Sequence, residues 1–154
     1  MLIDILTYPN PILTTPAKKV PRVDSKIQAL VQDMIETMRA NKGVGLAAPQ
    51  VGRALRLIVI EYQPDQDDPK AVAIPLQVLI NPKILSKDNG VENAIEGCLS
   101  LPNIEVSVPR FKKIKVRATN FDSKIIQFRA RDFHARILQH ELDHLDGKLI
   151  IDYQ

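Results

Sequence analysis

Two histidines and a glutamate near the end of the sequence have the types and the spacing of a metal-dependent hydrolase site. His140, Glu141 and His144 lie in the segment His-Glu-Leu-Asp-His. On a helix, residues four apart lie about 40° apart on one face, so both imidazoles can bind the same divalent metal. The glutamate is rotated about 100° from the first histidine and is free to act as a general base on water. The spacing therefore predicts metal-assisted hydrolysis.

A third protein ligand is expected, because catalytic sites of this kind usually have three and keep one position open. Some proteases place a histidine six residues after the second one, but that position is Ile150, and the acid further along is Asp152. His134 precedes the first histidine by six residues and points about 120° away on the same helix. Cys98 is the best candidate, although taken alone it would be interpreted as a buried apolar cysteine.

The donor set of one cysteine and two histidines predicts the class of metal. It is softer than the two histidines and one glutamate of many zinc proteases, and it suits zinc or ferrous iron. A thiolate beside oxidisable iron would also make the protein oxygen-sensitive, which is a hypothesis that aeration of the iron form tests.

A glycine-rich segment, Gly-Val-Gly-Leu-Ala-Ala-Pro-Gln at residues 43–50, is not typical of nucleotide binding. A dinucleotide motif needs a strand before it and a helix after it, whereas a helix is predicted before this segment and a strand after it. We expect a loop that lets a peptide approach the main chain, with the Gln50 amide as a donor to a developing oxyanion. A plain helix C-cap followed by a turn is the alternative interpretation.

The composition indicates one domain, residues 1–154, without disulfides. Cys98 is the one cysteine, and the net charge of +3 with a pI of about 9.0 is too small to argue for nucleic-acid binding. The basic run 110–117 is expected to be a half-buried strand with solvated cations. The N-terminus has no basic signal region, and no apolar run approaches the ~18 residues of a membrane span. A cytoplasmic location is expected.

The elements follow from periodicity and turn residues. Apolar residues spaced at i, i+3, i+4 and i+7 predict a helix at 25–41, capped by Asp24 or Ser25 and ended by Asn41 and Gly43. Asp132 is expected to cap a last helix at about 133–145, which Asp146 and Gly147 close. The other expectations are an extended, proline-rich arm at 1–23, a hairpin turn at 120–124, and strands at 55–62, 76–85 (broken by Pro82), 104–108, 112–119 and 124–130. This order predicts an α+β fold.

Three segments together resemble peptide deformylase: 43–50, Glu-Gly-Cys-Leu-Ser at 96–100, and Gln-His-Glu-Leu-Asp-His at 139–144. Their order and separations are similar to those of the family, and the resemblance covers essentially the whole chain. It implies antiparallel sheets around a central C-terminal helix that carries His-Glu-x-x-His. It also implies removal of the formyl group from N-formylmethionyl nascent chains, with release of formate.

The resemblance implies roles for individual residues. Cys98, His140 and His144 would hold the metal, iron in the cell and zinc, nickel or cobalt in purified protein. Glu141 would move the proton from the attacking water to the leaving amine. The Gln50 amide and the Leu99 backbone N–H would stabilise the oxyanion. The peptide main chain would contact Val44, Gly45 and Gly97, and the methionine side chain would enter a pocket lined by Phe133, Arg136 and Ile137. Glu96 would orient a ligand.

Three departures from the family pattern bear on partners and specificity. The chain stops just after Tyr153, so ribosome docking through a C-terminal extension is not expected; short chains of this kind occur among organelle-like and phage-encoded members. Glu105 stands where many bacterial members have an arginine facing the peptide. Arg136 stands at a position that is often aliphatic and is expected to narrow or polarise the rim of the methionine pocket. The expected partners are formylated peptides at the ribosome, without direct nucleic-acid or membrane binding.

Two rival functions remain open from the sequence. A small zinc endopeptidase or aminopeptidase would need a downstream acid as the third ligand. A non-catalytic metal-binding module would need a fourth protein ligand that closes the site, and it would need neither Glu141 nor Gln50.

Overall fold

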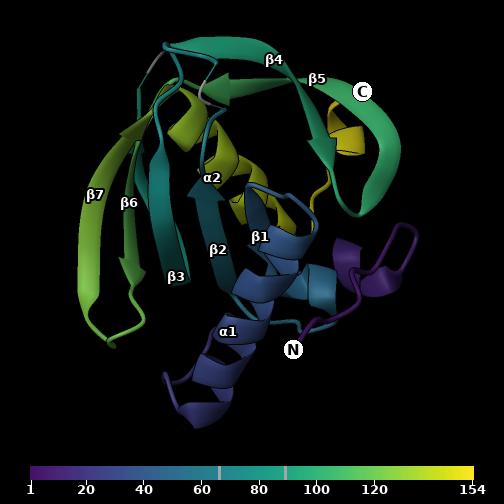
Figure 1. The fold of residues 1–154 in the computed structure, drawn as a ribbon, viewed down its shortest axis with the longest axis vertical. Helices are drawn as coiled ribbons and strands as arrows, with labels where there is room; N and C mark the ends of the chain where they lie inside the picture. Colours follow the sequence, from purple (N-terminus) through teal and green to yellow (C-terminus); the bar gives the residue numbers. More distant parts are fainter. Residues whose placement is uncertain (66, 89) are drawn as a thin grey trace.

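The computed structural model describes residues 1–65, 67–88 and 90–154. In these residues the strands form a five-stranded sheet and a two-stranded sheet, and two α-helices pack with them, so the predicted α+β class is confirmed; Figure 1 shows the arrangement. The larger elements are α1 (Ser25–Ala40), β1 (Gly45–Ala47), β2 (Leu57–Tyr62), β3 (Ile74–Lys87), β4 (Val91–Cys98), β5 (Leu101–Phe111), β6 (Lys113–Thr119), β7 (Ile125–Arg131) and α2 (Asp132–Leu145). Three 3-10 helices are η1 (Pro11–Thr14), η2 (Ala48–Val51) and η3 (Ile150–Tyr153).

The strands form two antiparallel sheets. The five-stranded sheet has the order β1-β2-β3-β6-β7, and β4 pairs with β5 as a separate ribbon. Strand β2 is buried on both faces: Ile58 and Ile60 belong to the core beneath α2, whereas Leu57 and Val59 belong to the core beneath α1. Because alternate residues of a strand point to opposite faces, the interior consists of two cores, with one helix on each face of the sheet.

Helix α2 lies between the five-stranded sheet and the β4–β5 ribbon, as Figure 1 shows. Gln139 joins it to the ribbon by accepting from the Phe111 backbone N–H (2.9 Å) and donating to the Phe111 carbonyl (2.8 Å). Both surfaces that contact α2 therefore position the residues it carries. No helix among the described residues is long and apolar enough to cross a membrane.

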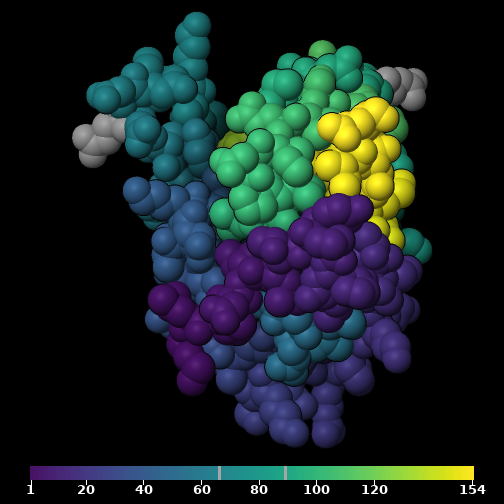
Figure 2. Space-filling model, turned by 90° about the vertical axis from the view of Figure 1, so that its right-hand side faces the viewer, coloured from purple at the N-terminus to yellow at the C-terminus, as the bar shows by residue number. Residues whose placement is uncertain are grey.

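The N-terminal arm is extended as expected, apart from η1, and Figure 2 shows it lying across the molecule beneath β4–β5 and the C-terminal segment. The arm is held by backbone hydrogen bonds, including Leu6 N–H to the Gln50 carbonyl (2.7 Å) and Tyr8 N–H to the Ser100 carbonyl (2.9 Å). Both acceptors belong to segments that border the candidate site, so the arm helps to hold these segments in place.

The ends of the helices partly differ from the predictions. Asp24 caps α1 by accepting from the Ile27 N–H, as expected. At the other end Asn41 is the C-cap, and the residue with left-handed backbone that follows it is Lys42 (φ 55°) rather than Gly43. The predicted cap Asp132 is instead the first residue of α2, and the N-cap Arg131 makes no side-chain cap bond. An acid in the first turn stabilises the helix by complementing its dipole, so the charge serves the helix without capping it.

Two strand predictions were incomplete or wrong. Pro82 does not break its strand, because β3 runs through it with a register shift between Ile80 and Lys83 and with Asn81 at φ 51°. Such a bulge accommodates a proline that cannot donate to the ladder. The prediction at 104–108 found only the middle of β5, and it missed β1 and β4.

Candidate active site

The three predicted metal ligands lie together where β4 ends beside α2. Cys98 is the last residue of β4, and His140 and His144 lie one turn apart on α2. One ligand atom from each lies within 4.8 Å of the others, and Cys98 Sγ is 3.4 Å from His144 Nε2. A thiol and two imidazoles at these separations fit one tetrahedral ion with a fourth position left open.

A carboxylate fixes the orientation of the first histidine. Glu96 Oε1 accepts a hydrogen bond from His140 Nδ1 at 2.9 Å, which leaves Nε2 to face the ligand cluster. Carboxylate partners of this kind orient metal-bound histidines and raise their basicity. His144 Nδ1 is buried without a hydrogen-bond partner among the described residues.

Glu96 is itself held by two arginines. Arg110 contacts both of its carboxylate oxygens, at 2.9 Å and 2.8 Å, and Arg136 Nη1 lies 2.6 Å from Oε2. Arg110 also contacts Asp143 and the Tyr153 hydroxyl. Burial raises the pKa of Glu96, but hydrogen bonds from Arg110 and His140 outweigh it and hold that pKa at about 2. Glu96 is therefore a fixed anion beside the ligand cluster.

Arg110 is the site-supporting residue that the sequence interpretation missed. It was assigned to a run of solvated cations, yet it is only 4% exposed. The residues Val106, Val108 and Arg110 share the buried face of β5, and this spacing of two is the signal that could have found it. A buried arginine in a strand needs a carboxylate partner, and the acid nearest the cysteine in sequence is Glu96.

Glu141 lies against the main chain of β1. A Cβ added to Gly45 would be 2.7 Å from Glu141 Oε1, so only glycine allows this approach. Burial raises the pKa of Glu141 to about 7, with a smaller opposing effect from His140. Its Oε2 is buried without a partner among the described residues. A carboxylate whose pKa is near neutral can both accept and release a proton.

Burial and hydrogen bonds shift the pKa values of the two histidines in opposite directions. Burial lowers the pKa of His140, but hydrogen bonds with Cys98 and Glu96 more than offset this and raise it to about 10. Burial lowers the pKa of His144 well below its ordinary value. Because a histidine binds metal through an unprotonated ring nitrogen, protons compete with the metal for this site, and the metal affinity is expected to depend on pH.

Gln50 points its amide nitrogen into the site. Its Oε1 accepts from the Ala47 N–H (2.9 Å), so its Nε2 is the end that faces Ser100 Oγ (3.1 Å) and Cys98 Sγ (3.6 Å). The bond to Ala47 fixes the orientation of the amide. The Gln50 amide donor is therefore pre-oriented beside the Cys98 thiol.

The predicted substrate-binding residues line one cavity of about 410 Å³. Its walls come from the glycine segment, the end of β4 and the first turns of α2. The lining includes Val44, Gly45, Gln50, Gly97, Cys98, Leu99, Phe133, Arg136, Ile137, His140 and Glu141. Polar and reacting groups thus gather at one end of a partly apolar cavity, which is typical of small-ligand sites.

Two predicted departures have different outcomes. Arg136 does line the cavity, but its guanidinium is bound by Glu96 and by the backbone carbonyls of Val108 (2.9 Å) and Glu92 (2.6 Å). It ties α2 to the β4–β5 ribbon in addition to lining the wall. Glu105 is exposed on β5 and is not among the described residues that line the cavity.

His134 lies away from the ligand cluster, as its helical position predicts. Its ring stacks on Phe128 at 5.8 Å, and its Nε2 is 2.7 Å from Gln77 Oε1. Asp152, the downstream acid that a protease would need, instead accepts from the Leu149 N–H at 2.9 Å. Among the described residues the metal-binding group has only three members, so no fourth protein ligand closes it.

The comparisons with known proteins identify the family of the chain. The sequence matches the family model described as Polypeptide deformylase over residues 2–154. It is 47% identical to a peptide deformylase of Dictyoglomus thermophilum, with 99% of this chain and 92% of the relative covered. It is 42% identical to a peptide deformylase of Aquifex aeolicus, with 99% and 87% covered.

Solved structures are similar over the same length. The crystal structure of peptide deformylase from Ehrlichia chaffeensis superimposes with a TM-score of 0.93 at 35% identity, covering 99% of this chain and 88% of that chain. A class I type b peptide deformylase from Acinetobacter baumannii with bound Met-Ala-Ser superimposes with a TM-score of 0.94 at 30% identity, covering 100% and 99%. The chain therefore belongs to the polypeptide deformylase family, the metal-dependent hydrolases that remove the N-formyl group from nascent chains.

Proposed function

We propose that Cys98, His140 and His144 hold the metal and that Glu141 is the catalytic acid–base of the deformylation reaction. The observation that carries this assignment is the convergence of three ligand atoms and a buried carboxylate at one end of a single cavity. A divalent ion bound there supplies Lewis-acid chemistry, which lowers the pKa of water, to about 7 in zinc enzymes, and polarises the formyl oxygen.

The protein groups then divide the proton and charge transfers. Glu141 takes a proton from the attacking water as the water oxygen bonds to the formyl carbon. The Gln50 amide and the Leu99 backbone N–H donate to the formyl oxygen as negative charge develops there. Glu141 returns the proton to the amine nitrogen as the C–N bond breaks. Formate and a free N-terminal amine are the products.

The cavity supports an N-formylmethionyl peptide as the substrate. We propose that the peptide backbone lies along Val44, Gly45 and Gly97, where small residues permit close approach and strand-like pairing. The methionine side chain enters between Phe133 and Ile137, with the stem of Arg136 as a further wall. A relative from Acinetobacter baumannii has been solved with Met-Ala-Ser, which is the product of such a reaction.

Formate release from formyl-Met-Ala-Ser by anaerobic protein loaded with ferrous iron or nickel tests the assignment. We expect Glu141→Ala to keep its metal and to lower kcat/KM by about 10²–10⁴-fold, the usual contribution of a positioned acid–base. Metal content measured on the same samples separates loss of the base from loss of the ion. Absence of formate release from folded, metal-loaded wild-type protein would overturn the proposal.

Ferrous iron is the metal we propose for the cell, with zinc, nickel or cobalt in purified material. The thiol of Cys98 with two imidazoles suits these ions, and a thiolate beside iron is open to oxidation. Aeration should inactivate the iron form and spare the nickel form. Full activity of an aerated sample that still holds its iron would contradict the hypothesis.

The reaction also implies where the protein works. We propose that its substrates are nascent chains at the ribosome, in the cytoplasm of a bacterium or of a phage-infected host, or in an organelle that starts synthesis with formylmethionine. Its relatives named above are bacterial proteins.

A further inference from the structure

One face of the five-stranded sheet carries a dense array of cations. We call it the basic face and define it by Lys83, Lys113, Lys115, Arg117, Arg129 and Arg131. Strand β6 shows how it arises, because its cations at 113, 115 and 117 alternate with the buried residues Ile114, Val116 and Ala118. The strand therefore buries one side and turns the charged side outward.

The register places these cations opposite one another. Lys113 pairs with Arg131, Lys115 with Arg129, and Arg117 with Lys83. Like charges directly opposite on neighbouring strands destabilise a sheet. Within the described parts of the chain, none of these six cations takes part in an ion pair closer than 4.0 Å, in contrast to Arg110 and Arg136. The sheet therefore carries a repulsion between like charges that its folding does not require.

The surface is hollowed along this array. A hollow of about 580 Å³ is lined by four cations of the basic face and by Lys87 at the end of β3, with Asp88 as an acid at its margin. A second hollow of about 560 Å³ continues the array at the other end of the strands, where Lys83 and Arg117 are joined by Lys19 and Arg56. The small net charge hides this concentration, since residues 110–131 hold eight lysines and arginines and a single acid, Asp122.

We propose that the basic face binds the phosphate backbone of structured RNA. Cations repeat about every 6.6 Å along a strand and about 4.8 Å across strands, so they form a broad lattice of positive points. Phosphate contacts of this kind supply affinity without base recognition. This replaces the expectation of no direct nucleic-acid binding, which rested on net charge alone.

The outward residues favour RNA over a lipid surface. Membrane-surface elements combine cations with a continuous apolar stripe and aromatic rings. On β3, β6 and β7 the exposed large apolar residues are Leu76, Leu85 and Ile125, and no described residue of these strands is an exposed aromatic. Gln127, opposite Arg117, and Ser86, opposite Lys115, add neutral hydrogen-bonding groups to the array instead.

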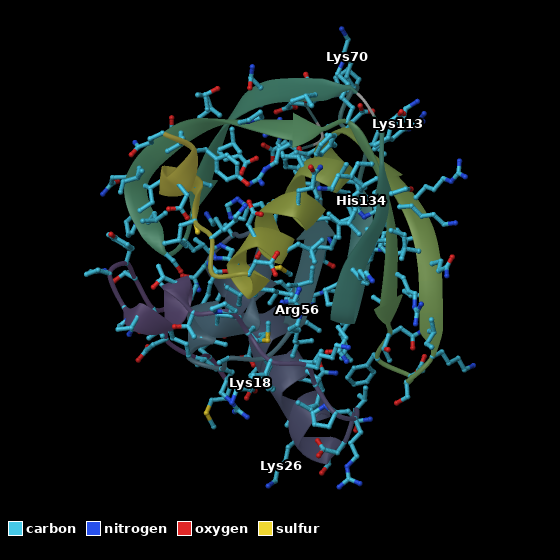
Figure 3. All side chains as sticks on the ribbon, turned by 180° about the vertical axis from the view of Figure 1, so that it is seen from behind. Lys18, Lys26, Arg56, Lys70, Lys113 and His134 are labelled. Atoms are coloured by element: carbon cyan, nitrogen blue, oxygen red, sulfur yellow. The ribbon has the colours of Figure 1, made fainter. Side chains whose placement is uncertain are left out.

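The basic face ends beside the mouth of the active site. Phe133 lines the catalytic cavity and also a neighbouring hollow that contains Arg129 and Arg131. Figure 3 shows Lys113 and His134 at the end of the molecule where α2 begins, far from Lys26 at the tip of α1. RNA bound on the basic face would therefore hold the cavity mouth close to the RNA surface, as a substrate emerging from a ribosome requires; that last step rests on the proposed function.

Binding of a fluorescein-labelled RNA duplex of about 16 base pairs, followed by anisotropy, tests the proposal with metal-loaded protein. The variant K115Q/R117Q/R129Q removes three cations from the basic face. The control K18Q/K26Q/K148Q removes three exposed cations elsewhere and changes the net charge of +3 equally. Circular dichroism melts show whether both variants fold. A salt series on the wild-type protein tests the proposal independently of any substitution.

We expect wild-type binding to weaken linearly in log–log salt plots. The face variant should bind at least about tenfold more weakly and flatten the slope by about 2–3, since each phosphate contact contributes about 0.7–0.9. The control should retain wild-type binding, and all three proteins should release formate from formyl-Met-Ala-Ser equally, which separates this proposal from the proposed function. Equal weakening in both variants, or binding to phosphatidylserine vesicles in preference to RNA, would overturn it.

Discussion

At the scale of single residues, Glu96 connects the proposed metal ligands to the rest of the protein. Its carboxylate accepts from His140 and is held by Arg110 and Arg136. Two cations around one anion make the carboxylate a fixed point, so the imidazole that it orients is fixed as well. The site is prepared by ionic contacts that reach across β4, β5 and α2.

Replacement of Glu96 should therefore act on the metal. We expect Glu96→Gln to weaken metal binding by about 10–100-fold, because the amide is a poorer acceptor for the His140 N–H and no longer supports a basic imidazole. Competition with a chromogenic chelator measures the affinity. The exposed neighbour on the same strand, Glu92→Gln, is the matched control, because Glu92 contacts Arg136 only through its backbone carbonyl. Unchanged affinity in Glu96→Gln would show that the carboxylate does not tune the ligand.

Residue types and spacing predicted the candidate ligands better than the residues that hold those ligands in place. The two histidines were identifiable because four residues make about one helical turn, and the cysteine because the pair lacked a third ligand. Arg110 was not, since a cation in a basic run gives no sign in sequence of whether it faces water or a buried acid. Its partner lies 14 residues away on a strand that the sequence did not predict.

At the scale of elements, the short strand β1 sets the position of Glu141, the proposed general base. Gly45 is one of its three residues, and Glu141 on α2 packs against it so closely that a methyl group does not fit. The approach of a strand backbone to a helix side chain thus depends on one missing Cβ.

Gly45→Ala should therefore impair catalysis while leaving the metal in place. The added Cβ would meet Glu141 at 2.7 Å, and either the carboxylate or β1 must move. We expect kcat to fall by about 10²-fold, as for other displacements near 1 Å, with metal content unchanged. Gly90→Ala is the control, because its nearest neighbour would be 3.5 Å away on the flexible Lys112 side chain. A fully active Gly45→Ala enzyme would remove the steric argument.

Elements with a clear period were predicted and those without one were not. Helix α1 and strands β2, β6 and β7 have regular apolar spacing, and their predicted ranges agree within a few residues. Strand β4 buries only Glu96 among its eight residues, because it belongs to a two-stranded ribbon with little core beneath it. Strand β1 is too short to show any alternation. The pairing order of the larger sheet depends on contacts between distant segments, which local patterns do not encode.

At the scale of the whole molecule, the three proposed metal ligands come from two parts that otherwise meet along α2. Cys98 comes from the β4–β5 ribbon, and both histidines come from the helix that covers the five-stranded sheet. An ion held by all three therefore links the ribbon to the main body. Because the unfolded chain does not bring these residues together, binding favours the folded state.

Removal of the metal should consequently lower the thermal stability of the entire protein. At a free metal concentration of about 100 times Kd, binding contributes about 2.7 kcal/mol, which for a chain of this length corresponds to a shift of about 5–10 °C in Tm. Anaerobic melts of the nickel form with and without chelator measure it. Cys98→Ala should show little chelator-dependent shift, because it lacks a ligand that spans the two parts. His134→Gln, which changes a histidine outside the cluster, should keep the full shift. Equal shifts in wild-type protein and Cys98→Ala would mean that the ion stabilises the protein without bridging ribbon and helix, and the cysteine would then lose its structural role.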